Sequence, residues 1–534
     1  MRVVSRGTTM KAGAAILAGL VLATTISAPA TAAPVIANPS FESSASALTG
    51  WTVTGTTSAA SIGTDAPQNG ARRANLWSAS AYTTEIAQTV TNLAAAWYTL
   101  RVWVKSGSAT PGQALDATTV GLRNCGGSAK SVTAPSTEQD NGWVQVAVSA
   151  YVSGGSCTIA LKTSATVGGA WAQFDNVTMT NERIVRTIRG ADVSTLPKNQ
   201  AFGALYKDAA GATIAPLTLL ASSGVNYARI KVWVNPADGY NNKAKVIALA
   251  QQAQAAGMKI LVDFHYSDTW ADPGAQKIPA AWSSYDLSAL ASAVTAHTDD
   301  VLTGLKSVGV TADMVQIGNE INPGMLITGG AASGAVSDWT NLGTLLKAGS
   351  NAARAVFPST KIILHLTNLN NGVATLQSWY NSAVAQGVSF DVIGLSFYGY
   401  WHGSLASLQS GANTLLAAFP AKTLAVVETA YGFTLAQDDA EPQIFAAAQV
   451  IPGYPATPVG QASHLRAVQN IVAGLPANRG LGVFYWEPTW TAVAGSGWDP
   501  TNPGSGNGWE NQAIFDYSDR LLPVGREFAA DPGQ

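Results

Sequence analysis

The sequence predicts an α/β protein in which an all-β, jelly-roll-like sandwich precedes a (β/α)8 barrel of the TIM type. Composition allows this, because the 534-residue chain is 47% hydrophobic and only 12% charged and can therefore bury large cores in two domains. The pattern also changes near residue 184. Short alternating segments separated by turns give way to apolar strands that alternate with helical stretches.

The charge balance limits the class of partner. The formal net charge is −2 and no block of lysine or arginine occurs, so we expect neither nucleic acid nor a membrane as a partner. A neutral ligand fits this balance better. The 16 tryptophans and 15 tyrosines agree with a sugar ligand, because aromatic faces stack on sugar rings, although each could equally pack in a core.

Residues 1–33 are typical of a signal peptide. Basic residues without an acid come first, the apolar run AGAAILAGLVLATTI follows, and the small residues APATAA predict cleavage near Ala32 or Ala33. The apolar run is too short to be a good transmembrane anchor, and no other stretch is long enough to span a membrane. We therefore expect a secreted, extracellular protein.

Residues 34–182 predict the β-sandwich. Segments such as YTLRVWVKSG, GWVQVAVSAYV and WAQFDNVTMT alternate apolar and polar residues, and turn-rich pieces separate them. Both cysteines of the chain, Cys125 and Cys157, lie in this region. In an oxidising compartment they favour a disulfide over two free buried thiols.

Residues 184–534 predict the barrel, in which eight apolar strands alternate with helices. The expected strands are RTIRGADVS, YARIKVWV, KILVDFHYS, MVQIGNEI, KIILHLTN, DVIGLSFYG, TLAVVETAYG and GLGVFYWEP. Stretches between them, such as NKAKVIALAQQAQAAG and SDWTNLGTLLKAGSNAARAV, carry apolar residues at helical spacing. Eight such units in about 350 residues indicate a (β/α)8 barrel.

Polar residues are concentrated at the carboxyl ends of these strands, where barrels of this class carry their active sites. Glu320 ends the fourth strand and Glu428 ends the seventh, on opposite sides of the barrel mouth. Glycosidic-bond hydrolysis uses two carboxyl groups, which lie about 5 to 5.5 Å apart in retaining enzymes. We therefore predict a catalytic pair, in preference to two acids that each merely pair with a nearby arginine or lysine.

Several stretches of the barrel together resemble one enzyme family. They are RGADVS, RIKVWVNP, DFHYSDTWADPGAQKIPAAW, IGNEINPGML, GLSFYGYWHG, VVETAYGFT, FYWEPTW and GWENQAIFD, and they cover about residues 184 to 530. The chain is similar here to the arabinogalactan endo-β-1,4-galactanases, glycoside hydrolase family 53, in the clan A retaining barrel hydrolases. HYSDTWADP and YWHG are more specific than NE, which the whole clan shares. The resemblance implies endo-acting cleavage of β-1,4-galactosidic bonds in galactan and in the type I arabinogalactan of pectin.

The resemblance also implies roles for individual residues. Glu320 would be the general acid/base and Glu428 the nucleophile, while Asn319 would hold the 2-hydroxyl of the sugar. Arg229 and Tyr398 would hydrogen-bond the nucleophile and keep it ionised, as an adjacent guanidinium does. The substrate cleft would be lined by His265, Asp268, Trp270, Asp272, Trp401, His402, Trp486 and Glu487.

Hydrolysis by two carboxyl groups requires no cofactor. Some bacterial members of the family hold a structural calcium ion in loops after the last strands, and Asp438, Asp439 and Asp499 are weak candidates for its ligands here. Acids in exposed loops are more often solvated. The sequence contains no Gly-x-Ser-x-Gly elbow, Walker loop or His-Glu-x-x-His motif, which leaves other catalytic schemes without support.

The segments NPSFES, GWTVTG and FDNV resemble in pattern the carbohydrate-binding domains that precede many secreted glycanases. Trp77, Tyr82 and Trp51 are the aromatic candidates for sugar binding, and each could instead belong to the sandwich core.

Two alternatives remain at this point. The barrel could be a related retaining endo-glycanase acting on mannan, xylan or cellulose, or the chain could bind glycan without cleaving it. The joint presence of Asn319, Glu320, Glu428 and Arg229 argues against the second, because a pure binder needs no facing acid and nucleophile. We expect a monomer whose partner is galactan.

Overall fold

The structure is a computed structural model that describes residues 33–530. The expected signal peptide therefore lies outside the described residues, apart from Ala33. Within residues 33–530, none of the helices combines the length and the apolar character that a membrane crossing requires.

Residues 52–180 form a β-sandwich of two five-stranded sheets, whose strands pair antiparallel. One sheet has the order β1 (Thr52–Gly55), β4 (Tyr82–Leu93), β9 (Gly155–Ala165), β6 (Thr118–Arg123) and β7 (Lys130–Thr133). The other has the order β2 (Ala60–Gly63), β3 (Arg73–Trp77), β10 (Trp171–Thr180), β5 (Ala96–Gly107) and β8 (Val144–Val152).

The alternation in the sequence decides which side chains fill the sandwich. In β5, Leu100, Val102 and Val104 are fully buried in the core between the sheets, so the intervening residues point outward. Cys125 and Cys157 form the expected disulfide.

The three aromatic candidates of the sandwich separate in the structure. Trp51 and Tyr82 are buried in the core, whereas the side chain of Trp77 is 50% exposed. The first two are therefore packing residues, and Trp77 alone remains available to a ligand.

Residues 188–485 contain the predicted barrel, which is closed and built from eight parallel strands. In order around the ring they are β11 (Ile188–Asp192), β12 (Tyr227–Val232), β13 (Lys259–Phe264), β14 (Ala312–Ile317), β17 (Lys361–Leu366), β18 (Val392–Ser396), β19 (Thr423–Thr429) and β20 (Gly480–Tyr485). Seven of the expected strands contain the observed one, and the fourth, MVQIGNEI, overlaps β14, which begins two residues earlier at Ala312.

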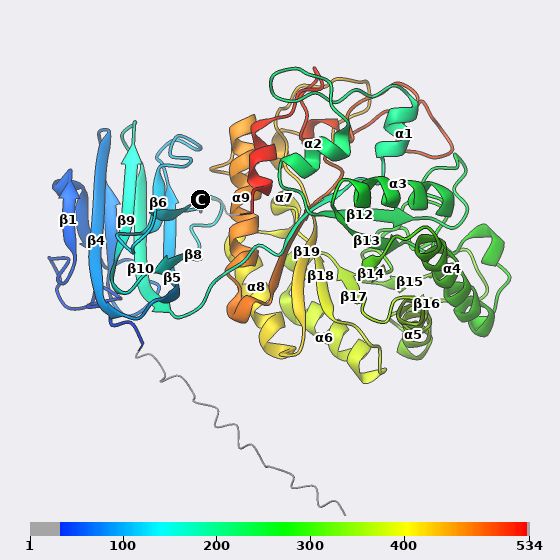
Figure 1. Ribbon diagram of the computed structural model, residues 1–534, viewed down its shortest axis with the longest axis horizontal. Coiled ribbons are helices and arrows are strands. Elements are labelled where there is room, and N and C mark those ends of the chain that lie inside the picture. The colour runs from blue at the N-terminus through cyan, green and yellow to red at the C-terminus, as the bar shows by residue number, and fades with distance from the viewer. Residues whose placement is uncertain (1–32, 531–534) are drawn as a thin grey trace, which may run out of the picture. The chain divides into compact units, whose positions relative to one another are not determined.

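Helices surround this ring (Figure 1). They are α1 (Leu196–Ala201), α2 (Pro216–Ser222), α3 (Lys243–Ala255), α4 (Leu287–Ser307), α5 (Trp339–Val356), α6 (Val373–Ala385), α7 (Gly399–His402), α8 (Leu405–Ala418) and α9 (Pro458–Ala473). The main helices begin where the sequence supplies a side-chain cap. Asn242, Asp286 and Asp338 accept backbone N–H groups at the starts of α3, α4 and α5.

An apolar cluster packs among the barrel strands. It includes Ile188, Tyr227 and Val392, each the first residue of its strand, together with Phe484. A Cβ atom on Gly190 would lie only 2.1 Å from the Phe484 ring, so glycine is needed for this packing. The buried Asp192, by contrast, is the last residue of β11, at the end where barrels of this class carry their active sites.

Candidate active site

The carboxyl ends of the barrel strands surround a cleft with a volume of about 680 Å³. Its aromatic lining consists of Trp270, Trp401, Trp486, Trp490, Trp498, Trp509 and Tyr398. Its polar lining includes His265, Asp272, Asn319, Glu320, Thr367, Asn368, His402, Glu428 and Glu441. The structure thus brings both predicted catalytic carboxyl groups into one aromatic cleft.

Glu320 reaches the cleft through a turn directly after β14. Gly318 has φ +80° and Glu320 has φ +47°, which is the left-handed region that a glutamate rarely adopts. Such a conformation costs of the order of 1 kcal/mol and is often found at functional sites. Asn319, between the two, donates from Nδ2 to the carbonyl oxygen of Ala271 at 2.8 Å. This turn therefore holds the Asn–Glu pair rigidly at the cleft.

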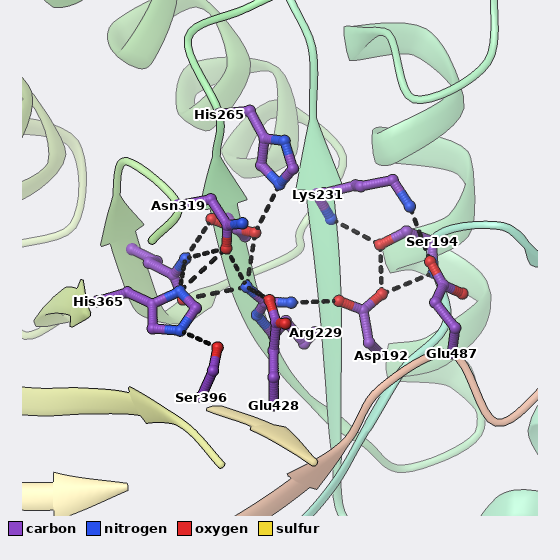
Figure 2. A network of polar contacts seen from close by, with 12 residues as sticks. Asp192, Ser194, Arg229, Lys231, His265, Asn319, His365, Ser396, Glu428 and Glu487 are labelled. Carbon is purple, nitrogen blue, oxygen red and sulfur yellow. Dashed lines mark hydrogen bonds and ion pairs between the residues drawn. The ribbon is translucent and has the colours of Figure 1, made fainter. Parts of the chain in front are cut away.

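Glu428 lies in β19, where the pairing with β20 is irregular. One carboxylate oxygen lies 2.9 Å from Nη2 of Arg229, and the other accepts a hydrogen bond of 3.0 Å from the Tyr398 hydroxyl. Arg229 is fully buried and also pairs with Asp192 at 2.6 Å and Asp263 at 2.8 Å (Figure 2). The contacts expected of Arg229 and Tyr398 with Glu428 are both present.

Glu320 has a different set of partners. Ser396 Oγ donates to its Oε1 at 2.5 Å, and the same Oγ lies 2.8 Å from Nε2 of His365. A hydroxyl group has one hydrogen, so His365 carries its proton on Nε2 and donates to Ser396. Burial holds the pKa of His365 well below its usual range, and the imidazole is therefore neutral. Within residues 33–530, no cation contacts Glu320 as directly as Arg229 contacts Glu428.

Burial raises the pKa of both catalytic candidates. The pKa of Glu320 is raised to about 7, with the nearby charge of Asp272 as a further cause. The pKa of Glu428 is raised to about 8, although the Arg229 guanidinium opposes the shift. The charge of Glu320 raises the pKa of Glu428 in turn, so the two carboxyl groups share one proton near neutral pH.

Comparison with known proteins identifies the barrel. A sequence model described as glycosyl hydrolase family 53 matches residues 188–526, which is more than half of the chain. The chain belongs to glycosyl hydrolase family 53. An endo-beta-1,4-galactanase from Bacillus subtilis (strain 168) is 34% identical, over 63% of this chain and 84% of that protein. An arabinogalactan endo-beta-1,4-galactanase from Cellvibrio japonicus (strain Ueda107) is also 34% identical, over 64% of this chain and 90% of that protein.

Among solved structures, the family 53 catalytic domain of Ignisphaera aggregans is similar to this chain. It is 37% identical with a TM-score of 0.61, and the match covers 65% of this chain and 96% of that domain. The chain is therefore a glycoside hydrolase with a family 53 barrel.

Two of the residues expected to line the cleft of this family 53 hydrolase lie elsewhere. Glu487 is fully buried and forms an ion pair of 2.7 Å with Lys231, while its second oxygen accepts the hydroxyl of Thr195 at 2.5 Å. Asp268 accepts the backbone N–H groups of Asn235 and Ala280, each at 2.9 Å. Both acids support the loops behind the cleft and do not line it.

The Lys231–Glu487 pair nevertheless bears on the cleft, because the Lys231 ammonium lies 4.0 Å from the centre of the Trp270 ring. Trp270 in turn stacks on Trp490 with ring centres 5.7 Å apart. The other expected lining residues, His265, Trp270, Asp272, Trp401, His402 and Trp486, all face the cleft.

The geometry around the calcium candidates does not fit a calcium site. The two carboxylate oxygens of Asp439 accept the backbone N–H groups of Glu441 and Asn507, and Asp499 accepts that of Thr501. Among residues 33–530, no three acidic, histidine or cysteine side chains are gathered as metal ligands. We derive no role for a metal from these loops.

Some site residues receive no role from the sequence. Ser396, Asp192 and Asp263 are polar residues at strand ends, but their contacts with Glu320 and Arg229 depend on pairing around the ring. Trp490, Trp498 and Trp509 line the cleft from loops after β20. Trp490 lies in FYWEPTW and Trp509 in GWENQAIFD, so the family resemblance of these stretches could have indicated both. Trp498 lies outside every matching stretch.

Proposed function

We propose that this family 53 hydrolase is a secreted endo-β-1,4-galactanase that cleaves galactan and type I arabinogalactan by retaining double displacement. The observation that supports it best is the unequal environment of two carboxyl groups in one cleft. Glu428 contacts a guanidinium and a phenol, whereas Glu320 contacts a serine hydroxyl. Paired acids with different surroundings are what acid and nucleophile roles require.

In this proposal Glu320 carries the shared proton, and the contacts of the two carboxyl groups support that choice. Burial raises the pKa of Glu428 at least as far as that of Glu320, so burial alone would place the proton on either residue. The ion pair with Arg229 and the hydrogen bond from Tyr398 stabilise the Glu428 carboxylate directly. Neighbouring acids disfavour a charge on both residues, so these two direct contacts are what favours the carboxylate form of Glu428.

In the first step, the Glu428 carboxylate attacks the anomeric carbon while Glu320 donates its proton to the departing glycosidic oxygen. This gives a covalent galactosyl-enzyme and frees the first product. In the second step, the ionised Glu320 takes a proton from water, and the water oxygen displaces Glu428 from the anomeric carbon. The configuration is retained, Asn319 holds the 2-hydroxyl group, and the chemistry needs no cofactor.

The relatives support galactan as the substrate, since those from Bacillus subtilis and Cellvibrio japonicus are named as galactanases. The cleft is compatible with such a polymer, because its tryptophan lining offers stacking surfaces to successive sugar rings.

A panel of polysaccharides tests the substrate. The protein is incubated separately with unbranched β-1,4-galactan, mannan, xylan and cellulose, and product sizes are followed by chromatography. We expect short galacto-oligosaccharides early, from galactan alone. Faster cleavage of another polymer would transfer the assignment to that glycan, and binding of galactan without any cleavage would make the chain a binding protein.

Azide distinguishes the two carboxyl roles with an aryl β-galactoside as substrate. Glu428→Gly should form the α-galactosyl azide, because azide replaces the missing nucleophile in a single inversion. Glu320→Ala should form the β-galactosyl azide, because azide then attacks the galactosyl-enzyme. Each variant should lose at least about 10²-fold to 10⁴-fold of its activity on galactan. The opposite pairing of azide products would reverse the two roles.

Secretion and a monomeric state are further parts of this proposal. Sequencing the amino terminus of protein recovered from culture medium should find it beginning near Ala33 or Pro34. Light scattering of the same sample should give the mass of a single chain. Protein retained in the cells, or a dimer mass, would contradict the respective expectation.

A further inference from the structure

The outward side of one sandwich sheet carries aromatic and polar residues that the barrel chemistry does not use. In β3, β10 and β5 the core residues Leu76, Phe174 and Val104 point inward. The residues that alternate with them therefore point outward. We call the surface formed by Trp77, Trp171, Gln173 and Lys105 the tryptophan face.

Strand register brings these four residues together. Trp171 of β10 lies opposite Trp77 of β3 on one side and opposite Gly107 of β5 on the other. Gln173, two residues along β10, lies opposite Lys105 of β5. Since neighbouring strands are about 4.8 Å apart, the tryptophan row spans about 10 Å across three strands.

Gly107 leaves room for the ring of Trp171. A Cβ atom at residue 107 would lie 2.6 Å from Cγ of Glu138 and 2.8 Å from Cζ2 of Trp171, so the indole ring and the glutamate together occupy the space of a side chain. The ring of Trp171 therefore leans toward β5, away from Trp77. Trp77 itself is 50% exposed. The two rings offer separate apolar surfaces to one extended ligand.

Lys105 is a polar residue of the tryptophan face whose ammonium group has no hydrogen bond within the described part of the protein. It is only 5% exposed, and its ammonium lies 5.0 Å from the centre of the Trp143 ring. Among the described residues, the hydrogen bonds and ion pairs include none from this ammonium group, nor any from the side-chain amide of Gln173. Neither group is among the buried polar atoms that lack a partner, so both can donate hydrogen bonds to a ligand at the surface.

The loop between β2 and β3 gives the tryptophan face a fixed border. Asp175 of β10 accepts the backbone N–H groups of Gln68 and Asn69 at 2.8 and 2.9 Å. The indole N–H of Trp143 donates to the carbonyl oxygen of Ala66 at 3.0 Å. Hydrogen bonds therefore hold this loop across the sheet at one end of the face.

We propose that the tryptophan face binds a β-1,4-galactan chain, with sugar rings stacked on Trp77 and Trp171 and hydroxyl groups bonded to Gln173 and Lys105. The identity of the polymer rests on the proposed function of the barrel. The charges around the face also favour a neutral ligand, because the cations Lys105 and Arg73 are balanced by the nearby acids Asp65 and Asp140. Amides and tryptophans suit a polyol better than an anion.

The binding site would keep the hydrolase on its insoluble substrate, since linking two sites on one chain makes the second encounter intramolecular. Two readouts follow. Adhesion to polymeric galactan should depend on the tryptophan face, whereas hydrolysis of a short soluble galacto-oligosaccharide should depend on the barrel cleft alone.

Adhesion is measured by affinity electrophoresis in galactan, with the full chain carrying Glu428→Gln so that the polymer stays intact. Adding Trp77→Ala and Trp171→Ala together should weaken retention by about tenfold or more, as the loss of central aromatic contacts does. Gln173→Ala should weaken it by about threefold to tenfold. Tyr151→Ala is the matched control, because Tyr151 is also a 50% exposed aromatic residue of the same sheet, and it should leave retention unchanged.

In the active chain, the double variant should release less sugar from insoluble galactan but keep its kcat/KM on galactotetraose. Equal retention of the double variant, the control and the parent would overturn the proposal, as would stronger retention on xylan or mannan than on galactan. If near-ultraviolet circular dichroism shows a misfolded double variant, Gln173→Ala and Lys105→Met decide in its place. Face-dependent retention without any galactan cleavage would refute the proposed activity and leave the face assignment standing.

Discussion

The guanidinium of Arg229 lies 2.9 Å from the carboxylate of Glu428, and both side chains are buried. The same guanidinium pairs with Asp192 and Asp263, so one cation serves three acids from three strands (Figure 2). Burial disfavours the charge of Arg229, but the neighbouring carboxylates outweigh burial and raise the pKa of the guanidinium, which therefore stays charged. The nucleophile is thus held by a cluster that also ties together the first, second, third and seventh strands of the barrel.

Arg229→Met should destabilise the protein by roughly 3–5 kcal/mol, because it leaves buried acids without their counter-charge. Urea unfolding followed by tryptophan fluorescence measures the loss. Arg354→Met is the control, since its ion pair with Asp391 is partly exposed and should contribute no more than about 1 kcal/mol. Equal losses in the two variants would show that Arg229 is not a structural centre of the site.

Asp272→Asn should move the alkaline limb of the kcat/KM profile to lower pH. Glu320 acts while protonated, so the rate falls as pH rises through its pKa of about 7. The charge of Asp272 raises that pKa, and removing the charge therefore lowers it. The shift should shrink at high salt, because Asp272 faces solvent. Asp300→Asn, another exposed acid, should leave the limb unmoved; a limb at higher pH in Asp272→Asn would contradict the prediction.

His464→Gln should make stability less sensitive to acid. Burial beside Tyr431 lowers the pKa of His464 to about 3, against about 6.5 in an unfolded chain. Below pH 6.5 the unfolded state therefore binds a proton that the folded state does not, and stability falls until about pH 3. Between pH 7 and pH 5 the variant should lose about 2 kcal/mol less than the parent. Urea unfolding at both pH values measures this, and equal losses would refute it.

Removing the disulfide should lower the thermal stability of the sandwich more than that of the barrel. Cys125 and Cys157 are 32 residues apart, and closing a loop of that length stabilises a fold by about 3–4 kcal/mol in the chain-entropy treatment. We expect calorimetry to show an earlier sandwich transition in Cys125→Ala/Cys157→Ala, with galacto-oligosaccharide hydrolysis at 25 °C unchanged. Cys125 follows β6 and Cys157 lies in β9 of the same sheet, so an unshifted transition would mean that strand pairing and packing stabilise this sheet without the disulfide.

The sequence alone was sufficient for the eight strands and for the positions of Glu320 and Glu428. Buried parallel strands are continuous apolar runs, and a polar residue at the end of such a run is a local feature that needs no knowledge of distant contacts. The disulfide followed similarly from the number of cysteines and the expected compartment.

Tertiary structure decided the rest, because it depends on which distant residues meet. Glu487 and Glu428 both end barrel strands, yet Lys231 draws one into a buried pair while the other faces the cleft. Trp51 and Trp77 are the same residue type in one sandwich. The path and register of the strands decide that Trp51 is buried in the core and Trp77 is exposed at the surface. Hydrophobic periodicity is a local property of the sequence. Burial and charge pairing depend on residues that are distant in the sequence and become neighbours only in the folded chain.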